Sequence, residues 1–124
     1  DMDYLGYLSY ADSISTFSTM NVGMAPSATG VTRDVACPLK IFDYLSCGLP
    51  VITSGSGEWT QIVSRCGCGY VTKASQAREF NECLKSLDRR TWEEMSSNGL
   101  RLIKEEFNWN TLLKKIDEVV EGCR

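Results

Sequence analysis

The sequence predicts an α/β domain built on a doubly wound parallel sheet, with helices on both faces and three helices closing the C-terminus. Short apolar or β-branched runs alternate with helical stretches over residues 4–73, which is typical of parallel βαβ units. Residues 75–122 carry helical periodicity alone. With 124 residues and a hydrophobic content of 43%, the chain has the size and composition of one folded domain, which we expect to span residues 1–124.

The first predicted strand is the aromatic-rich run at residues 4–8, and a helix with a weak apolar stripe follows over residues 10–19. Residues 20–25 predict a second strand, which Pro26 closes. The stretch 27–35 is rich in Ser, Thr and Gly without periodicity, so it predicts a loop. The length of this loop is typical of loops that carry function.

A helix is predicted to begin at Pro38 and to end at Gly48. Proline suits the first position of a helix, and glycine favours the left-handed conformation that ends one. The β-branched run at 51–53 predicts a strand, a further helix begins near Glu58, and residues 70–71 predict one more brief strand.

The last fifty residues predict three helices, each with its own apolar stripe at helical spacing. The stripes are Ala77, Phe80, Leu84 and Leu87; Trp92, Met95, Leu102, Ile103 and Phe107; and Leu112, Leu113, Ile116, Val119 and Val120.

Charge and composition exclude several classes of function. The chain has 13 Lys and Arg against 16 Asp and Glu, so it lacks the basic field that attracts nucleic acid, and we expect no nucleic-acid partner. No apolar run approaches the roughly 18 residues of a membrane helix, and the N-terminal residues do not resemble a signal peptide. These features predict a cytoplasmic protein. The absence of histidine removes the commonest general acid–base group and most catalytic zinc sites.

The six cysteines predict neither a disulfide framework nor a metal site. Disulfide frameworks are typical of smaller, loop-rich secreted chains. One residue separates Cys66 from Cys68, whereas zinc knuckles and thioredoxin-type sites have two. We expect reduced cysteines, with Cys47, Cys66 and Cys83 filling core or near-core positions, and neither a metal nor a cofactor.

The most specific feature of the sequence is the string PLKIFDYLSCGLPVI at residues 38–52. It resembles the nucleotide-sugar-binding helix of retaining glycosyltransferases of the group 1 type. The usual form there is an acidic residue, an apolar stretch, then Cys- or Ala-Gly-x-Pro-Val and a strand. Residues 21–27 resemble the family's strand ending in Pro-Ser, and residues 54–63 resemble its glycine-rich turn and following helix. Residues 107–109 resemble its Phe-Ser/Thr-Trp before the last helix.

This resemblance implies a two-lobed GT-B architecture in which the chain is most of the C-terminal, donor-binding lobe. The chain would then be a partial Rossmann-like domain, incomplete on its N-terminal side, with the acceptor lobe as a partner outside this sequence. The implied activity is transfer of a sugar from a nucleotide diphosphate sugar to an acceptor that the sequence does not specify. Because that transfer needs donor and acceptor held together, we expect the 124-residue chain alone to be inactive. The longer enzyme is compatible with peripheral attachment to a membrane.

The predicted donor site lies at the start of the helix that follows the loop. Unpaired amides and the positive end of the helix dipole at residues 37–40 suit a diphosphate or a polar sugar. Asp43 is placed to accept hydrogen bonds from a ribose diol, and Lys40 is placed to stabilise charge developing on the leaving nucleoside diphosphate. No side chain is expected to act as a nucleophile. The expected binding residues are Ala36, Cys37, Leu39, Lys40 and Asp43.

The sequence departs from the family's pattern at one of its two acidic positions. That pattern is two glutamates separated by seven residues. The second position falls on Asp43, a shorter but competent carboxylate, and the first falls on Val35, which cannot bind a donor hydroxyl. Either the sugar is handled differently, with the neighbouring Asp34 contributing, or the site is degenerate.

Other interpretations remain open at this stage. Asp43 and Lys40 also fit an ordinary solvated helix face. The rival function is a non-catalytic α/β binding or assembly module derived from the same fold. A nucleotide-sugar epimerase of similar architecture is disfavoured because such enzymes generally need a histidine, and this chain has none.

The last apolar stripe predicts self-association. In the resembled family the final helix runs back against the acceptor lobe, so here the stripe has less to cover it. We expect a homo-oligomer formed through Leu112, Leu113, Ile116, Val119 and Val120, or through an open sheet edge near residues 4–8.

Overall fold

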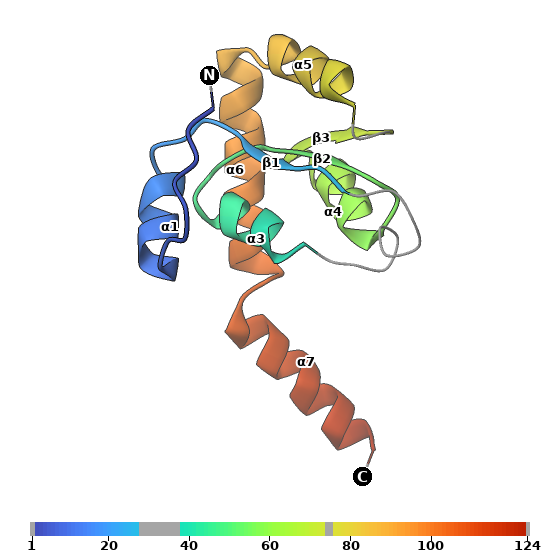
Figure 1. The fold of residues 1–124 in the computed structure, drawn as a ribbon. Coiled ribbons are helices and arrows are strands. Elements are labelled where there is room, and N and C mark those ends of the chain that lie inside the picture. Colours follow the sequence, from blue (N-terminus) through green and yellow to red (C-terminus); the bar gives the residue numbers. More distant parts are fainter. Residues whose placement is uncertain (1, 28–37, 74–75, 124) are drawn as a thin grey trace.

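The computed structural model describes residues 2–27, 38–73 and 76–123. Within these residues the chain forms three strands and six helices (Figure 1). Their bounds are α1 Tyr10–Phe17, β1 Gly23–Ala25, α3 Leu39–Ser46, β2 Val51–Ser54, α4 Glu58–Cys66, β3 Gly69–Thr72, α5 Ala77–Ser86, α6 Arg89–Glu105 and α7 Trp109–Gly122. The predicted α/β class, with a partial Rossmann-like sheet, is confirmed.

The three strands form one parallel sheet with β2 in the middle. Gly23 of β1 is aligned with Val51 of β2, which is aligned in turn with Gly69 of β3. All four residues of β2 are buried, as expected when helices cover both faces of a parallel sheet. Figure 1 shows α3 and α4 on one side of the sheet and α5 on the other.

The main core lies between the sheet and helices α3, α4 and α6. Ile41 and Leu45 of α3 face inward one turn apart, and Trp59 and Val63 of α4 repeat this spacing. Leu102 of α6 completes the cluster. Burial of a large apolar side chain contributes about 1.5–3 kcal/mol, so these inward stripes explain why the segments form helices on this face.

On the other side of the sheet, α5 contributes one buried residue, Phe80. The other residues of its predicted apolar stripe are less buried than Phe80. Ala77 and Leu84 are exposed, and Leu87 follows the end of the helix. The predicted stripe of α5 is therefore only partly used for packing.

Helices α3 and α4 end where the sequence places glycine. Gly48 has a φ of 74° and Gly67 a φ of 60°, a left-handed conformation that glycine adopts without strain. After α3 the Leu49 amide donates to the Tyr44 carbonyl at 3.0 Å. After α4 the Cys68 amide donates to the Val63 carbonyl at 3.3 Å.

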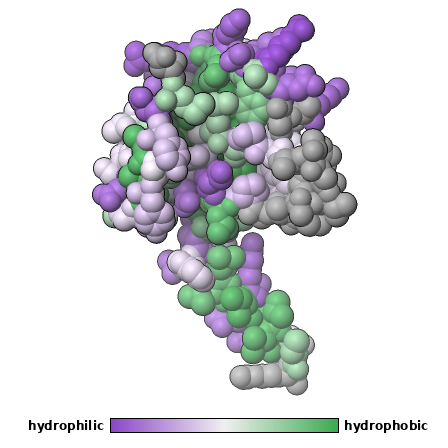
Figure 2. Space-filling view, in the orientation of Figure 1, coloured by the Kyte–Doolittle hydropathy of each residue, from purple (hydrophilic) through white to green (hydrophobic). Residues whose placement is uncertain are grey.

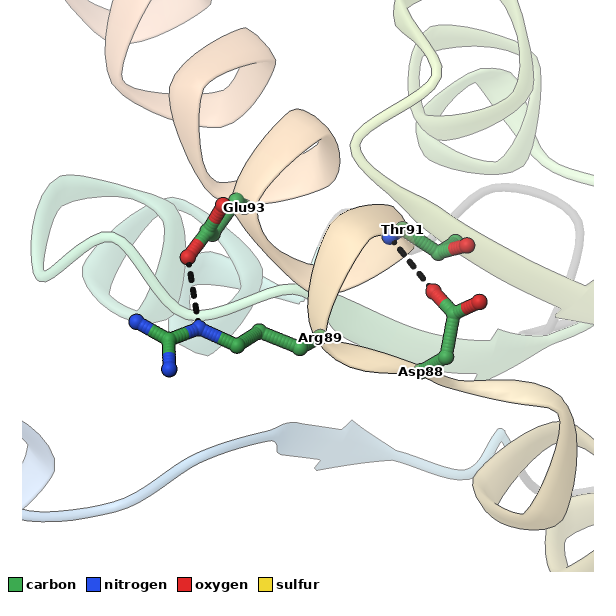
Figure 3. A network of polar contacts seen from close by, with 4 residues as sticks. All are labelled: Asp88, Arg89, Thr91 and Glu93. Atoms are coloured by element: carbon green, nitrogen blue, oxygen red, sulfur yellow. Dashed lines mark hydrogen bonds and ion pairs between the residues drawn. The ribbon is translucent and has the colours of Figure 1, made fainter.

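The start of α6 is fixed by a side-chain cap. The carboxylate of Asp88 accepts a hydrogen bond from the Thr91 amide at 2.7 Å (Figure 3). This hydrogen bond lowers the pKa of Asp88 from its ordinary value. Arg89 and Glu93 form an ion pair at 2.9 Å on the neighbouring turn (Figure 3), but exposed pairs of this kind contribute little to stability.

The prediction of a strand at residues 4–8 is wrong. Residues 2–9 have no regular secondary structure, and the side chains of Tyr4 and Tyr7 are 93% and 99% exposed. Gly6 has a φ of 68°, outside the extended region that a strand requires. Aromatic composition favours a strand only where a sheet neighbour is present.

Two other strands differ from their predicted extents. β1 begins at Gly23 rather than at residue 20, and β3 includes Gly69 and continues to Thr72. The predicted loop at 27–35 lies outside the described residues except for Ser27.

Helix α7 leads away from the rest of the molecule and contributes no buried residue (Figure 1). Hydrophobic side chains run along its length in the space-filling view (Figure 2). Across the described parts of the chain, no helix combines the length and apolar character that spanning a bilayer requires.

Candidate functional site

Three helices begin at the same edge of the sheet. The strands β1, β2 and β3 end at Ala25, Ser54 and Thr72, and the helices α3, α4 and α5 follow them in turn. Because the strands are parallel, their carboxyl ends and the N-termini of these helices lie together. In open α/β sheets ligands bind outside this edge.

Hydroxyl groups join the neighbouring strands at this edge. Thr53 Oγ1 donates to the Ala25 carbonyl at 2.9 Å, and Thr72 Oγ1 donates to the Thr53 carbonyl at 3.3 Å. The Ser27 amide donates to Ser54 Oγ at 3.0 Å. Sequence reasoning missed these residues, and the one available signal was a Thr-Ser pair directly after the apolar pair Val51 and Ile52. These hydrogen bonds connect the strand ends to one another beneath the helix N-termini.

The N-terminus of α3 has features that suit an anion. Pro38 stands at the N-cap rather than at the predicted first helical position, so α3 begins one residue later, at Leu39, and Pro38 makes no side-chain cap. The first amides of a helix have no intrahelical partner, and no acidic residue lies in the first turn of α3. Leu39 and Lys40 are exposed there. The dipole and the lysine therefore give this helix end a positive potential.

The other two helices at this edge differ from α3. α4 carries Glu58 in its first turn, and α5 carries Glu79. A carboxylate at this position complements the helix dipole and reduces its attraction for a second anion. Among the three, α3 is the helix whose first turn suits a phosphate.

Asp43 lies on the next turn of α3 and is half-buried. The Tyr10 hydroxyl of α1 lies 3.5 Å from Asp43 Oδ1 and is placed to donate to it. This distance is long for a hydrogen bond between oxygens, so the contact is weak and the carboxylate keeps acceptor capacity for a diol. Sequence reasoning missed Tyr10, because 33 residues separate it from Asp43 and the contact depends on how α1 packs against α3.

Aromatic packing holds α1 against α3. The rings of Phe17 and Tyr44 meet edge to face with their centroids 4.9 Å apart. Burial, and secondarily the charge of Asp43, raises the pKa of Tyr44 above its ordinary value. Tyr44 also lies against β1, where a Cβ on Gly23 would overlap its ring. Glycine at that position therefore allows α3 to approach the sheet closely.

Of the five predicted binding residues, the structure brings three together on the first two turns of α3, namely Leu39, Lys40 and Asp43. Ala36 and Cys37 lie outside the described residues, as do Val35 and Asp34. Within the part of the chain that is described, the candidate site thus consists of a helix N-terminus, one cation and one carboxylate.

Comparison with known proteins places the chain near the glycosyltransferases. It is similar to the chitobiosyldiphosphodolichol beta-mannosyltransferase of Debaryomyces hansenii, with 28% identity over 116 residues. The match covers 94% of this chain and 20% of the relative, so the chain spans about a fifth of the length of that protein. No protein-family model matches the chain, and no solved structure does. This distant relationship supports glycosyl transfer as the general class of function.

Proposed function

We propose that the chain is the donor-binding part of a glycosyltransferase and binds a nucleotide diphosphate sugar at the start of α3. The observation that carries the proposal is the arrangement of α3, where a helix end without an acidic residue stands one turn before Asp43 at the carboxyl edge of the sheet. The similarity to a mannosyltransferase supports it. The chain then corresponds to the C-terminal lobe of a two-lobed GT-B enzyme, with an acceptor lobe as its partner.

In this proposal each described residue has a separate task. The first amides of α3 and the ammonium group of Lys40 bind the diphosphate and stabilise the charge that develops on it as the sugar leaves. The Asp43 carboxylate accepts hydrogen bonds from the two ribose hydroxyls and fixes the nucleotide along the helix. The exposed side chain of Leu39, 75% accessible, covers one side of the bound nucleotide.

The stereochemical course is a separate part of the proposal. The resemblance at residues 38–52 implies retention, in which the product keeps the anomeric configuration of the donor. The relative is named as a beta-mannosyltransferase, and forming a β linkage from an α-linked donor requires inversion. NMR assignment of the anomeric carbon in a product made by the full-length enzyme decides between them. An α product from an α donor supports retention. A β product from an α donor would show inversion and would leave the proposed donor-binding role intact.

We also propose that the enzyme acts in the cytoplasm, with peripheral attachment to a membrane in its full-length form. Fractionation of cells that express the tagged full-length enzyme tests this. Recovery in the membrane fraction, with release by high salt or carbonate, supports peripheral attachment.

The donor-binding role predicts the effect of removing Asp43. Calorimetric titration of the 124-residue chain with UDP, GDP and ADP identifies the base that binds best. We expect Asp43→Ala to weaken that binding by about 5- to 150-fold, because removing one partner of a ribose hydroxyl costs about 1–3 kcal/mol. Asp3→Ala is the matched control, since Asp3 is an exposed carboxylate outside the site, and it should leave the affinity unchanged.

Two results would contradict the proposal. Equal affinity of the wild type and Asp43→Ala would mean that Asp43 is an ordinary surface residue of the helix and has no role in binding. Absence of binding for every nucleoside diphosphate, in a chain whose circular dichroism shows the expected helices, would favour the non-catalytic module.

A further inference from the structure

The helix that carries the candidate donor site, α3, meets an aromatic ring on two of its sides. Tyr44 packs against Phe17 of α1, and Phe42 packs against Phe107, with ring centroids 4.9 Å apart and ring planes 44° from parallel. Residues two positions apart on a helix project about 200° from one another, so these contacts lie on nearly opposite sides of α3. Phe42 directly precedes Asp43. The contact with Phe107 therefore adjoins the candidate site.

Phe107 belongs to the short joint between α6 and α7, residues 106–108, and its ring also packs against the main core. Beside it, Asn108 Nδ2 donates to the Lys104 carbonyl of α6 at 2.6 Å, and Asn108 Oδ1 accepts from the Thr111 amide of α7 at 3.0 Å. The Thr111 hydroxyl donates to the carbonyl of the last residue of α6 at 3.1 Å. These hydrogen bonds connect the end of α6 to the start of α7 across the joint.

The direction of α7 depends on this joint. Helix α7 leads away from the sheet (Figure 1) and contributes no buried residue, so little packing along its length holds it against the rest of the chain. An ion pair between Glu106 of the joint and Arg65 of α4, at 3.0 Å, is exposed and contributes little. Of the three joint residues, Phe107 alone has a large apolar side chain. We therefore expect a shift of α7 to reach α3 through the rings of Phe107 and Phe42.

We propose that Phe107 is a positioning residue that couples the placement of α7 to the placement of Lys40 and Asp43 on α3. This role rests on the proposed function, in which α3 binds the donor and an acceptor lobe is the partner of the chain. In the resembled family that lobe lies against the final helix, so α7 meets the partner while α3 holds the donor. The contact between Phe107 and Phe42 then aligns donor with acceptor. Such alignment matters because a misplacement on the order of 1 Å can cost about a hundredfold in rate.

Hydrogen exchange of the 124-residue chain tests the coupling without a ligand. Asn108→Ala removes side-chain hydrogen bonds to α6 and α7, yet we expect the amides of α3 to exchange at least about fivefold faster. Phe107→Leu should have a similar effect, and adding Asn108→Ala to it should give no further increase. Asp88→Ala is the matched control, because it removes the cap at the other end of α6 and should affect α3 less.

Two results of this experiment would overturn the coupling. Equal acceleration of α3 exchange by Asn108→Ala and Asp88→Ala would mean that α3 responds only to a lower stability of the whole fold. Additive effects of Asn108→Ala and Phe107→Leu would mean that the joint does not act on α3 through the Phe107 ring.

Nucleotide binding tests the coupling in the opposite direction, because coupling between two sites is reciprocal. With a saturating amount of UDP, GDP or ADP, whichever binds best, we expect the amides of α7 in the wild type to exchange at least about twofold more slowly. Phe107→Leu should abolish this response while changing the nucleotide affinity less than about threefold. Phe17→Leu is the matched control, because it removes the other aromatic contact of α3 and should keep the response.

The outcomes separate the positioning role from the proposed function. No response of α7 in a wild type that binds nucleotide, a response that persists in Phe107→Leu, or an equal loss in Phe17→Leu would each contradict the positioning role. A chain that binds none of the three nucleotides would contradict the proposed function instead. The exchange of α3 without ligand would then still decide whether the joint is coupled to that helix.

Discussion

Helices α3 and α4 begin at the same edge of the sheet, yet their first turns suit different partners. Each follows a strand, each lacks a side-chain cap, and each packs apolar residues one turn apart into the same core. α4 carries Glu58 in its first turn, whereas α3 carries Lys40 and no acid there. Packing decides where a helix N-terminus lies, but the exposed residues of its first turn decide what can bind to it.

The carboxyl ends of these two helices also differ, in the burial of a cysteine. Cys47 follows α3 and is half-buried, whereas Cys68 follows α4 and is fully buried. The Cys68 thiol donates to the Val63 carbonyl at 3.8 Å. Burial, with a smaller contribution from Cys66, raises the pKa of Cys68 to about 11. The tight turn at Gly67 thus places a neutral thiol in the core.

The largest expected effect is a loss of stability at high pH that depends on Cys68. The unfolded thiol loses its proton near its ordinary pKa of 9.0, and the folded one near 11. A raised pKa stabilises the fold below pH 9, and this contribution is lost as the pH rises to 11. Between pH 9 and pH 11 the free energy of unfolding should therefore fall by about 2–3 kcal/mol, which corresponds to two pKa units.

Urea unfolding of the wild type and of Cys68→Ala at pH 7 to 11 measures this effect. The variant should be less stable at neutral pH but should lose less stability between pH 9 and 11. Cys47→Ala is the control, because it removes the same side chain from a half-buried position outside the main core. Identical pH profiles for wild type and Cys68→Ala would show that the buried thiol does not contribute.

An aromatic ring of each helix, α3 and α4, packs against a glycine. A Cβ on Gly57 would overlap the Trp59 ring of α4, and a Cβ on Gly23 would overlap the Tyr44 ring of α3. Trp59 is 2% exposed and lies within the core, whereas Tyr44 is only partly buried, so we expect the Tyr44 ring to shift more readily than the Trp59 ring. We expect Gly57→Ala to destabilise the chain by about 1–3 kcal/mol, the usual cost of overpacking.

Gly23→Ala should cost less than Gly57→Ala, and thermal unfolding of the two variants measures the difference. The reverse order would mean that α3 is held more rigidly than α4. In that case the more rigidly held helix would be α3, which carries the candidate site.

Much of the fold could be predicted because it depends on local signals. The stripes of α3 and α4, and the glycines that end them, are readable within a few residues. The strand predicted at residues 4–8 failed because strand formation depends on a neighbour elsewhere in the chain, which local composition does not reveal. The glycine at position 6 was the one local warning, because glycine weakens a strand interior, and in the structure Gly6 is left-handed.

The candidate site also combines residues from one local stretch of sequence with residues that lie far from it in the chain. Lys40 and Asp43 were expected on one helix because they belong to one string of sequence, and the structure places both on α3; their binding role stays a prediction. Tyr10 and the hydroxyls of Thr53 and Thr72 could not, because their contacts depend on helix packing and strand register. The sequence therefore indicates groups that share a helix, whereas it does not reveal the groups that tertiary structure brings beside them.

The smallest expected effect tests the difference between the first turns of α3 and α4, and it assumes the proposed donor site. Lys40→Glu places an acid in the first turn of α3, so we expect affinity for the preferred nucleoside diphosphate to fall about tenfold, or about 1.4 kcal/mol. Glu58→Gln removes the acid from α4 and should change the affinity less than twofold. Calorimetry at low and moderate salt measures both, and the effect of Lys40→Glu should shrink as salt screens the charges. If Glu58→Gln instead strengthens binding and Lys40→Glu leaves it unchanged, the anion binds at α4, because the charge that matters is then the one beside that helix.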